Sequence, residues 1–446
     1  MKPYFEKDGI EIYHGHVLDV LKQMPKKYVQ MCVTSPPYYG LRNYGTDSVV
    51  WDDPGDCPTH EWGEPCQPTH KGQVKDSKAV TFENATGQNT PTGKFCIHCG
   101  AWFGSYGLEP TVELYVKHTV DIFREVRRVL RDDGVIWVNI GSSYTSGGRT
   151  HRKDFDSINT VAVQNLDRLK NPTGYKPKDL IPVPWLVGIA LQSDGWYLRS
   201  DIIWEKPNCL PESVKDRPTG SHEYVLLLSK NERYFYDKYA VLEPHKYDGR
   251  KVTRFSGSPK YRENGGAKND TMILKGSERW PGTGRNLRSV WTIPTQPFRG
   301  SHFAAFPEAL VERCIKSSTS EKGCCAKCGA PFQRVVEKIK PASREVTQFT
   351  PGGQIPQSFL AGNRQDSPSI IKTKAWCPTC DCNAGIVPCT VLDIFGGTGR
   401  TGIVSKRFCR KAVLVDLSPE YIDDMIKNIF GNTNAPPRHE QITLFS

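Results

Sequence analysis

The fold is decided by one stretch near the C-terminus, Val391-Leu392-Asp393-Ile394-Phe395-Gly396-Gly397-Thr398-Gly399-Arg400-Thr401-Gly402. An apolar strand runs into glycines spaced G-x-G-x-x-G, a turn that lets the backbone lie against a nucleotide-like ligand. A helix should follow, and the next strand, 411–415, ends at Asp416, where a carboxylate can bind ribose hydroxyls. This pattern predicts a nucleotide-binding α/β unit, with a dinucleotide-binding domain as the competing interpretation.

The place of this turn in the chain indicates a permuted sheet. The sequence ends at residue 446, which leaves room after Gly402 for one further strand and one or two helices. A nucleotide-binding sheet needs about five or more strands. We therefore expect the missing strands to come from the N-terminal part of the chain.

A second motif follows the strand expected at 29–33, which continues into Thr34-Ser35-Pro36-Pro37-Tyr38. Proline has no N–H, so the carbonyls of Ser35 and Pro36 are not claimed by a local helical turn. Acceptors beside an aromatic ring, at the carboxyl end of a strand, suit a flipped-out base with an amino group. An ordinary turn with a packed tyrosine is the alternative for this motif taken alone.

Further elements are expected between the two motifs. Apolar residues at helical spacing predict a helix over 111–131 that Gly134 ends, followed by a strand at 135–140. A helix is also expected at 17–24, and strands at 197–204 and 222–229. A helix followed by a strand is typical of a parallel sheet.

An early Ser-Pro-Pro-Tyr motif with a late glycine turn resembles the beta (permuted) class of site-specific DNA amino-methyltransferases, in its phage and bacterial forms. Segments at 107–111, 200–208, 222–224, 289–291 and 302–307 are similar to that family in the same order. Three positions depart from its usual pattern: His16 stands where the family has Asp, and Ile394 and Arg400 replace Pro and Thr.

The resemblance implies a Rossmann-like α/β fold and an S-adenosylmethionine-dependent enzyme that flips a base from double-stranded DNA and methylates its amino group by direct in-line transfer. Cytosine N4 is favoured over adenine N6, because the family uses Ser-Pro-Pro-Tyr mostly for cytosine. The expected catalytic residues are Ser35, Pro36, Pro37 and Tyr38. The expected cofactor-binding residues are Thr34, His302, Phe303, Asp393, Phe395, Gly396, Gly397, Gly399 and Asp416.

The sequence also bears on other activities. A cytosine ring-carbon methyltransferase needs a Pro-Cys nucleophile after the glycine turn, and neither Pro65-Cys66 nor Pro388-Cys389 stands there. A non-catalytic zinc-containing DNA-binding module, and amino methylation of RNA or of a small molecule, stay open as alternatives.

The 15 cysteines favour metal binding. No apolar run is long enough to span a bilayer and no signal peptide is present, so we expect a cytoplasmic protein, bacterial or in the host cell of a phage. In that reducing compartment, closely spaced cysteine pairs indicate zinc ligands rather than disulfides. Two structural zinc ions are expected, one on Cys57, His60, Cys96 and Cys99, the other on Cys325, Cys328, Cys380 and Cys382. Cys377 competes with Cys382 in the second set.

The domain organisation follows from these motifs. Residues 1–50 and 106–240 are expected to form the catalytic half, and 301–320 with 390–435 the cofactor half. Residues 51–105 and 321–389 are expected to be zinc-binding insertions. The segment 241–300, basic and aromatic within an overall net charge of +11, is expected to recognise the DNA target, with a solvated charged loop as the alternative.

Overall fold

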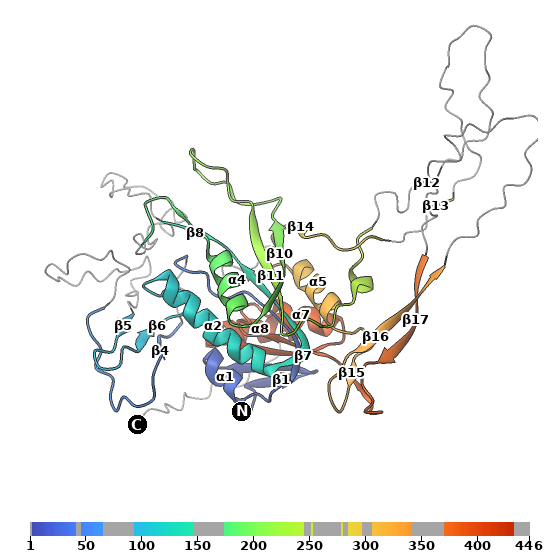
Figure 1. Ribbon diagram of the computed structural model, residues 1–446, viewed down its shortest axis with the longest axis horizontal. Coiled ribbons are helices and arrows are strands. Elements are labelled where there is room, and N and C mark those ends of the chain that lie inside the picture. Colours follow the sequence, from blue (N-terminus) through green and yellow to red (C-terminus); the bar gives the residue numbers. More distant parts are fainter. Residues whose placement is uncertain are drawn as a thin grey trace, which may run out of the picture.

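A nine-stranded sheet forms the centre of the molecule, with helices on both of its faces (Figure 1). The computed structural model describes residues 2–41, 46–65, 93–145, 174–244, 251–252, 278–279, 284–296, 306–339 and 370–431. Across the sheet the strands are β1 (Phe5–Lys7), β2 (Ile10–His14), β20 (Lys411–Asp416), β19 (Thr390–Asp393), β3 (Val29–Thr34), β7 (Leu130–Ile140), β11 (His222–Ser229), β10 (Tyr197–Glu205) and β14 (Val290–Thr292).

Successive side chains of the central strands point alternately into two apolar layers, one on each face of the sheet. Cys32 packs in one layer with helices α1 (Val17–Gln23), α2 (Val112–Val129) and α4 (Val183–Ser193). Met31 and Val33 pack in the opposite layer with α5 (Glu308–Ser318) and α7 (Arg400–Arg407). Helix α8 (Pro419–Phe430) covers β2 and β20. Burial on both faces explains why these strands read as continuous apolar runs.

The permuted order of the sheet is confirmed. Strand β19, which precedes the glycine turn, pairs in parallel with β3, with Val391 opposite Met31. Strand β20 pairs in parallel with β2, with Leu414 opposite Ile12. The C-terminal motif therefore lies inside a sheet whose neighbouring strands come from the N-terminus, as expected. Strand β7 is parallel to β3, β11 is antiparallel to both β7 and β10, and β14 is parallel to β10.

The expected boundary between the long helix and the following strand was wrong. Helix α2 ends at Val129 and β7 begins directly at Leu130, whose backbone is already extended. Gly134 lies inside the strand, where a Cβ atom would come 2.8 Å from the Gln30 carbonyl. The glycine is thus required by the close approach of β3 rather than by the end of a helix.

Smaller sheets carry the insertions. Strands β4 (Val49–Trp51), β5 (Lys94–Phe95) and β6 (Trp102–Gly104) form one, and β15 (Cys324–Cys325) pairs with β18 (Ile386–Val387). The hairpin of β16 (Phe332–Ile339) and β17 (Ile370–Pro378) projects from the body (Figure 1). Two short strand pairs and one 3-10 helix are the remaining elements among the described residues: β8 (Ser143–Tyr144) with β9 (Leu180–Ile181), β12 (Lys251–Val252) with β13 (Glu278–Arg279), and η1 (Lys238–Val241).

Most of the expected target-recognition segment, 241–300, lies outside the described residues. Across the part of the chain that the structure describes, no helix is long and apolar enough to cross a membrane.

Candidate active site

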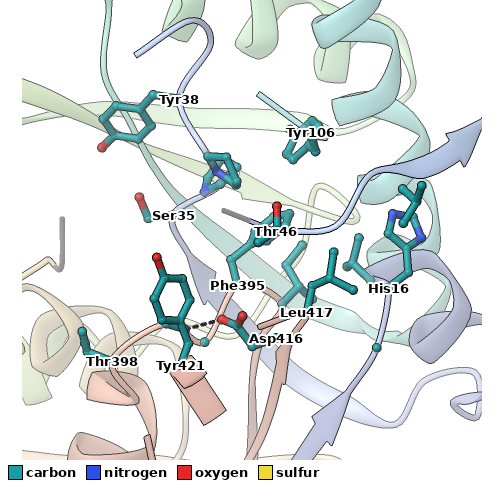
Figure 2. A pocket seen from close by; sticks show the side chains of 18 of the residues that line it. His16, Ser35, Tyr38, Thr46, Tyr106, Phe395, Thr398, Asp416, Leu417 and Tyr421 are labelled. Carbon is teal, nitrogen blue, oxygen red and sulfur yellow. Dashed lines mark hydrogen bonds between the residues drawn. The ribbon is translucent and has the colours of Figure 1, made fainter. Parts of the chain in front are cut away.

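One pocket lies at the carboxyl ends of β3, β19 and β20, and both sequence motifs line it (Figure 2). Ser35, Pro36, Pro37 and Tyr38 form one wall. Phe395, Gly396, Gly397 and Asp416 form another, and His16 lies at one end. Carboxyl ends of parallel strands are where α/β sheets bind ligands.

The glycine turn is held by a hydrogen bond that its backbone donates to Asp416. Its carboxylate accepts from the Gly397 amide at 2.8 Å (dashed line in Figure 2) and from the Ser418 amide at 3.0 Å. Gly397 has φ +49° and Gly399 has φ +76°, conformations that favour glycine. The turn therefore presents backbone to the pocket without side chains between.

Three of the expected cofactor residues, Thr34, Asp393 and Gly399, lie behind the pocket wall instead of lining it. Asp393 is 1% exposed and accepts hydrogen bonds from the Thr34 hydroxyl at 2.8 Å and the Thr401 hydroxyl at 2.6 Å. A Cβ atom on Gly399 would lie 2.6 Å from Met425, so this glycine serves the packing of α7 on α8. The other two expected residues, His302 and Phe303, lie outside the described residues.

The variant Asp393→Asn is expected to make the free energy of unfolding less dependent on pH. Burial raises the pKa of the Asp393 carboxyl to about 7, against about 3.9 in an unfolded chain. The folded protein keeps a proton that the unfolded chain releases between these values, so this group lowers the free energy of unfolding as pH rises from about 4 to 7. In urea unfolding without cofactor, the free energy of unfolding should fall less between pH 5 and pH 7.5 in the variant than in the unmodified protein. The same loss in both proteins would contradict the assignment.

The Ser-Pro-Pro-Tyr segment is fixed from behind. The Tyr115 hydroxyl donates to the Pro37 carbonyl at 2.9 Å. A Cβ atom on Gly107 would lie 3.0 Å from Pro37, so only a glycine lets that loop approach so closely. Within the described residues no group donates to the Pro36 carbonyl. The structure thus leaves this acceptor available at the pocket wall.

The Gly107 loop is itself tied to a buried pair. The Gly107 amide donates to Glu109 at 2.8 Å, and His118 lies 3.0 Å from the other Glu109 oxygen. Glu109 and His118 are both 0% exposed, and burial raises the pKa of Glu109. This pair supports the loop that packs on Pro37.

The network around the Tyr38 hydroxyl was not predicted from the sequence. That hydroxyl donates to Glu223 at 2.7 Å, and the Asn139 amide donates to Glu223 at 2.8 Å and to Tyr38. Lys206 forms an ion pair with the same carboxylate. Glu223 is the second residue of β11 and Lys206 follows β10, while Asn139 is near the end of β7. Only the pairing of these strands brings the four side chains together.

His16 lies at the far end of the pocket from Tyr38 (Figure 2). Its ring meets Trp51 edge-on, with centroids 4.8 Å apart. Burial lowers the pKa of His16 to about 4, so the ring is neutral near pH 7. Its Nε2 atom is buried without a partner among the described residues.

Two groups of potential metal ligands form, and each matches an expected set. Cys57, His60, Cys96 and Cys99 have ligand atoms within 4.8 Å of one another, and so do Cys325, Cys328, Cys380 and Cys382. In the first set the Cys57 and Cys96 sulfurs are 4.0 Å apart. Tetrahedral Zn²⁺ with Zn–S bonds of about 2.3 Å places sulfurs about 3.8 Å apart. Cys377 is exposed and outside the second set.

Comparisons with known proteins agree with this geometry. A family model described as DNA methylase, the N6/N4 methyltransferase family, matches residues 29–326. The Type II methyltransferase M.Cfr9I of Citrobacter freundii is 31% identical over 431 residues, covering 96% of this chain and 91% of the relative. M.SmaI of Serratia marcescens, also a Type II methyltransferase, is 36% identical over 313 residues, covering 70% and 76%.

Among solved structures, the PvuII DNA methyltransferase, titled cytosine-N4-specific, covers 97% of this chain and 91% of its own at 15% identity, with a TM-score of 0.48. The sequence relatives and the family model, rather than this likeness, carry the assignment. The chain belongs to the N6/N4 family of DNA methyltransferases.

Proposed function

We propose that this DNA methyltransferase uses S-adenosylmethionine to methylate the N4 amino group of cytosine in double-stranded DNA. The observation that carries the proposal is that the glycine turn and Ser35-Pro36-Pro37-Tyr38 line the same pocket. A cofactor on the turn and a base at the motif would share one cavity. This is the arrangement that direct transfer between two ligands requires.

The pocket fits the chemistry of the cofactor along its length. Asp416 lies between the His16 and Leu417 end and the Thr398 and Tyr421 end (Figure 2). A carboxylate there suits ribose hydroxyls, and the unpartnered His16 nitrogen with nearby Trp51 suits an adenine ring. When bound, the cofactor supplies an electrophilic methyl group. Phe395, Gly396 and Gly397 would contact it directly, while Thr34, Asp393 and Gly399 hold the wall behind.

The other wall suits an amino group of a flipped base. The free Pro36 carbonyl and the Ser35 hydroxyl can accept hydrogen bonds from the NH₂ group, which draws its lone pair out of conjugation with the ring. Tyr38 offers its ring for stacking, and its hydroxyl is fixed by Glu223 and Asn139. Positioning of this kind can lower a barrier by roughly 7–11 kcal/mol.

Adenine N6 is the second candidate, because the same acceptors can bind either amino group. Cytosine is preferred because Ser35 occupies the first motif position, where the resemblance associates serine with cytosine N4. Single-molecule sequencing of DNA from cells that express the protein should report N4-methylcytosine within one recognition motif. N6-methyladenine would overturn the cytosine proposal and keep the amino-methyltransferase.

Two structural zinc ions complete the proposal. Four cysteine or histidine ligands fill the coordination of Zn²⁺ and leave no open position for chemistry, so both sites would be structural. We assign target recognition to 241–300, and the protein to the cytoplasm, on the sequence features given above.

Cofactor binding tests the enzyme part of the proposal separately. Isothermal calorimetry should show one S-adenosylmethionine bound per chain, with or without DNA. If the purified protein binds DNA but no S-adenosylmethionine, a non-catalytic DNA-binding module becomes the better description.

A further inference from the structure

A buried cation in the pocket wall has no acidic partner in the part of the chain that the structure describes. Arg400 is 5% exposed and lines the pocket, two residues after Thr398 in the chain, which lines it as well. Its guanidinium donates to the side-chain oxygen of Gln296 and, at 3.4 Å, to the Gln296 carbonyl. Both acceptors are neutral. Glu308 is the acid whose charge acts on Arg400, and it already forms an ion pair with Arg407.

A charge in such a place is costly unless an anion completes the site. A guanidinium has five N–H donors, and two contacts to one glutamine leave several unused. Arg410 offers a contrast in the same region of the chain. It is also buried, but its Nε, Nη1 and Nη2 atoms all donate to the Thr319 hydroxyl and to the Phe408 and Thr319 carbonyls, outside the pocket.

The shape of the cofactor indicates which anion belongs there. The sulfonium sulfur carries three branches, namely the ribose, the methyl group and the amino-acid chain. With the ribose at Asp416 and the methyl group facing Ser35, the third branch must run along the remaining wall. Figure 2 places Thr398 and Tyr421 at that end, away from His16. Arg400 is the only lysine or arginine among the described residues that line the pocket.

We propose that Arg400 binds the α-carboxylate of the cofactor's amino-acid chain, as a paired, charge-assisted contact. This inference rests on the proposed use of S-adenosylmethionine. Arg400 is the first residue of α7, so the positive end of the helix dipole adds to the attraction for an anion. Gln296 holds the guanidinium in place from its other side. Arg400 is a position where this chain departs from its family's usual threonine, so the contact would be a property of this chain.

The test compares two ligands that differ in the amino-acid chain. S-adenosylhomocysteine carries the carboxylate, and 5′-methylthioadenosine has the same nucleoside and sulfur but no carboxylate. In Arg400→Met, calorimetry should show about 100-fold weaker binding of S-adenosylhomocysteine and binding of 5′-methylthioadenosine within about twofold of the unmodified protein. Arg400→Lys keeps a cation without the planar fork and should lose about tenfold, for S-adenosylhomocysteine only.

The control is Lys406→Met, on the same helix but outside the pocket and paired with Asp8, which should bind both ligands like the unmodified protein. Equal weakening of both ligands in the two Arg400 variants would assign Arg400 to packing and overturn the proposal. Unchanged S-adenosylhomocysteine binding with weaker DNA binding would assign it to a DNA phosphate and also overturn it. If the unmodified protein binds neither ligand, the proposed cofactor fails first.

Discussion

The double variant Ser35→Ala, Tyr38→Ala is expected to lose methyl transfer while it still binds S-adenosylmethionine. The serine hydroxyl and the tyrosine ring face the base side of the pocket, whereas the glycine turn and Asp416 are untouched (Figure 2). Loss of both an acceptor and a stacking surface should lower the transfer rate by at least about 10³-fold, since positioning is most of the catalysis. Transfer of a radioactive methyl group to DNA, beside calorimetry of cofactor binding, measures the two properties separately.

Single variants divide the effect between ring and hydroxyl. Tyr38→Phe keeps the stacking ring but breaks its hydrogen bonds with Glu223 and Asn139, so it should be impaired less than Tyr38→Ala. Tyr197→Ala is the matched control, because this exposed tyrosine lies at the start of β10, away from the pocket. Substantial transfer by the double variant would remove the motif from the mechanism. Loss of cofactor binding in it would show that the substitutions disturbed the turn as well.

The parts of this site that the sequence could predict are those whose chemistry lies within one short segment. The glycine turn carries its own strand, turn and acid, so Asp416 could be placed from local order alone. The link between β19 and β3 was also predictable, because the C-terminal unit had too few strands to form a sheet.

The support of Tyr38 could not be predicted in the same way. Asn139, Lys206 and Glu223 lie on three strands, and each looks like an ordinary polar residue next to an apolar run. Their meeting depends on the antiparallel register of β7, β11 and β10, which opposes Glu205 to His222 and Tyr224 to Ile140. The packing of Arg400 on Gln296 is likewise a contact between residues about a hundred positions apart.

Removing a ligand from the second metal site should have a large effect on stability. The insertion that carries this site, which includes β15 and β18 and is called the zinc ribbon below, leads directly into the cofactor half, since β18 ends at Val387 and β19 begins at Thr390. Gln30 of β3 connects the two parts, because its amide donates to the Gly329 carbonyl at 3.1 Å and its oxygen accepts from the Thr390 amide at 2.6 Å. Loss of zinc would therefore disturb the start of β19 as well as the zinc ribbon.

Cys325→Ser is accordingly expected to lower the zinc content from two ions to one per chain and the free energy of unfolding by about 4–5 kcal/mol. Elemental analysis measures the first quantity, and urea unfolding followed by tryptophan fluorescence measures the second. Cys382→Ser should behave in the same way. Cys377→Ser is the matched control, because Cys377 lies in β17 close to these ligands but outside the set, and it should keep both ions.

The pattern across the three variants decides the fourth ligand. Loss of an ion in Cys377→Ser but not in Cys382→Ser would exchange the two cysteines in the site. Less than one ion per chain in the unmodified protein would refute both metal sites. In that case the cysteines would be free thiols, and the loop at Cys328 and Gly329 would depend on its hydrogen bonds from Arg131 and Gln30. The β16–β17 hairpin would then be tied to the body by contacts such as the Arg334–Asp237 ion pair, without a metal ion at its base.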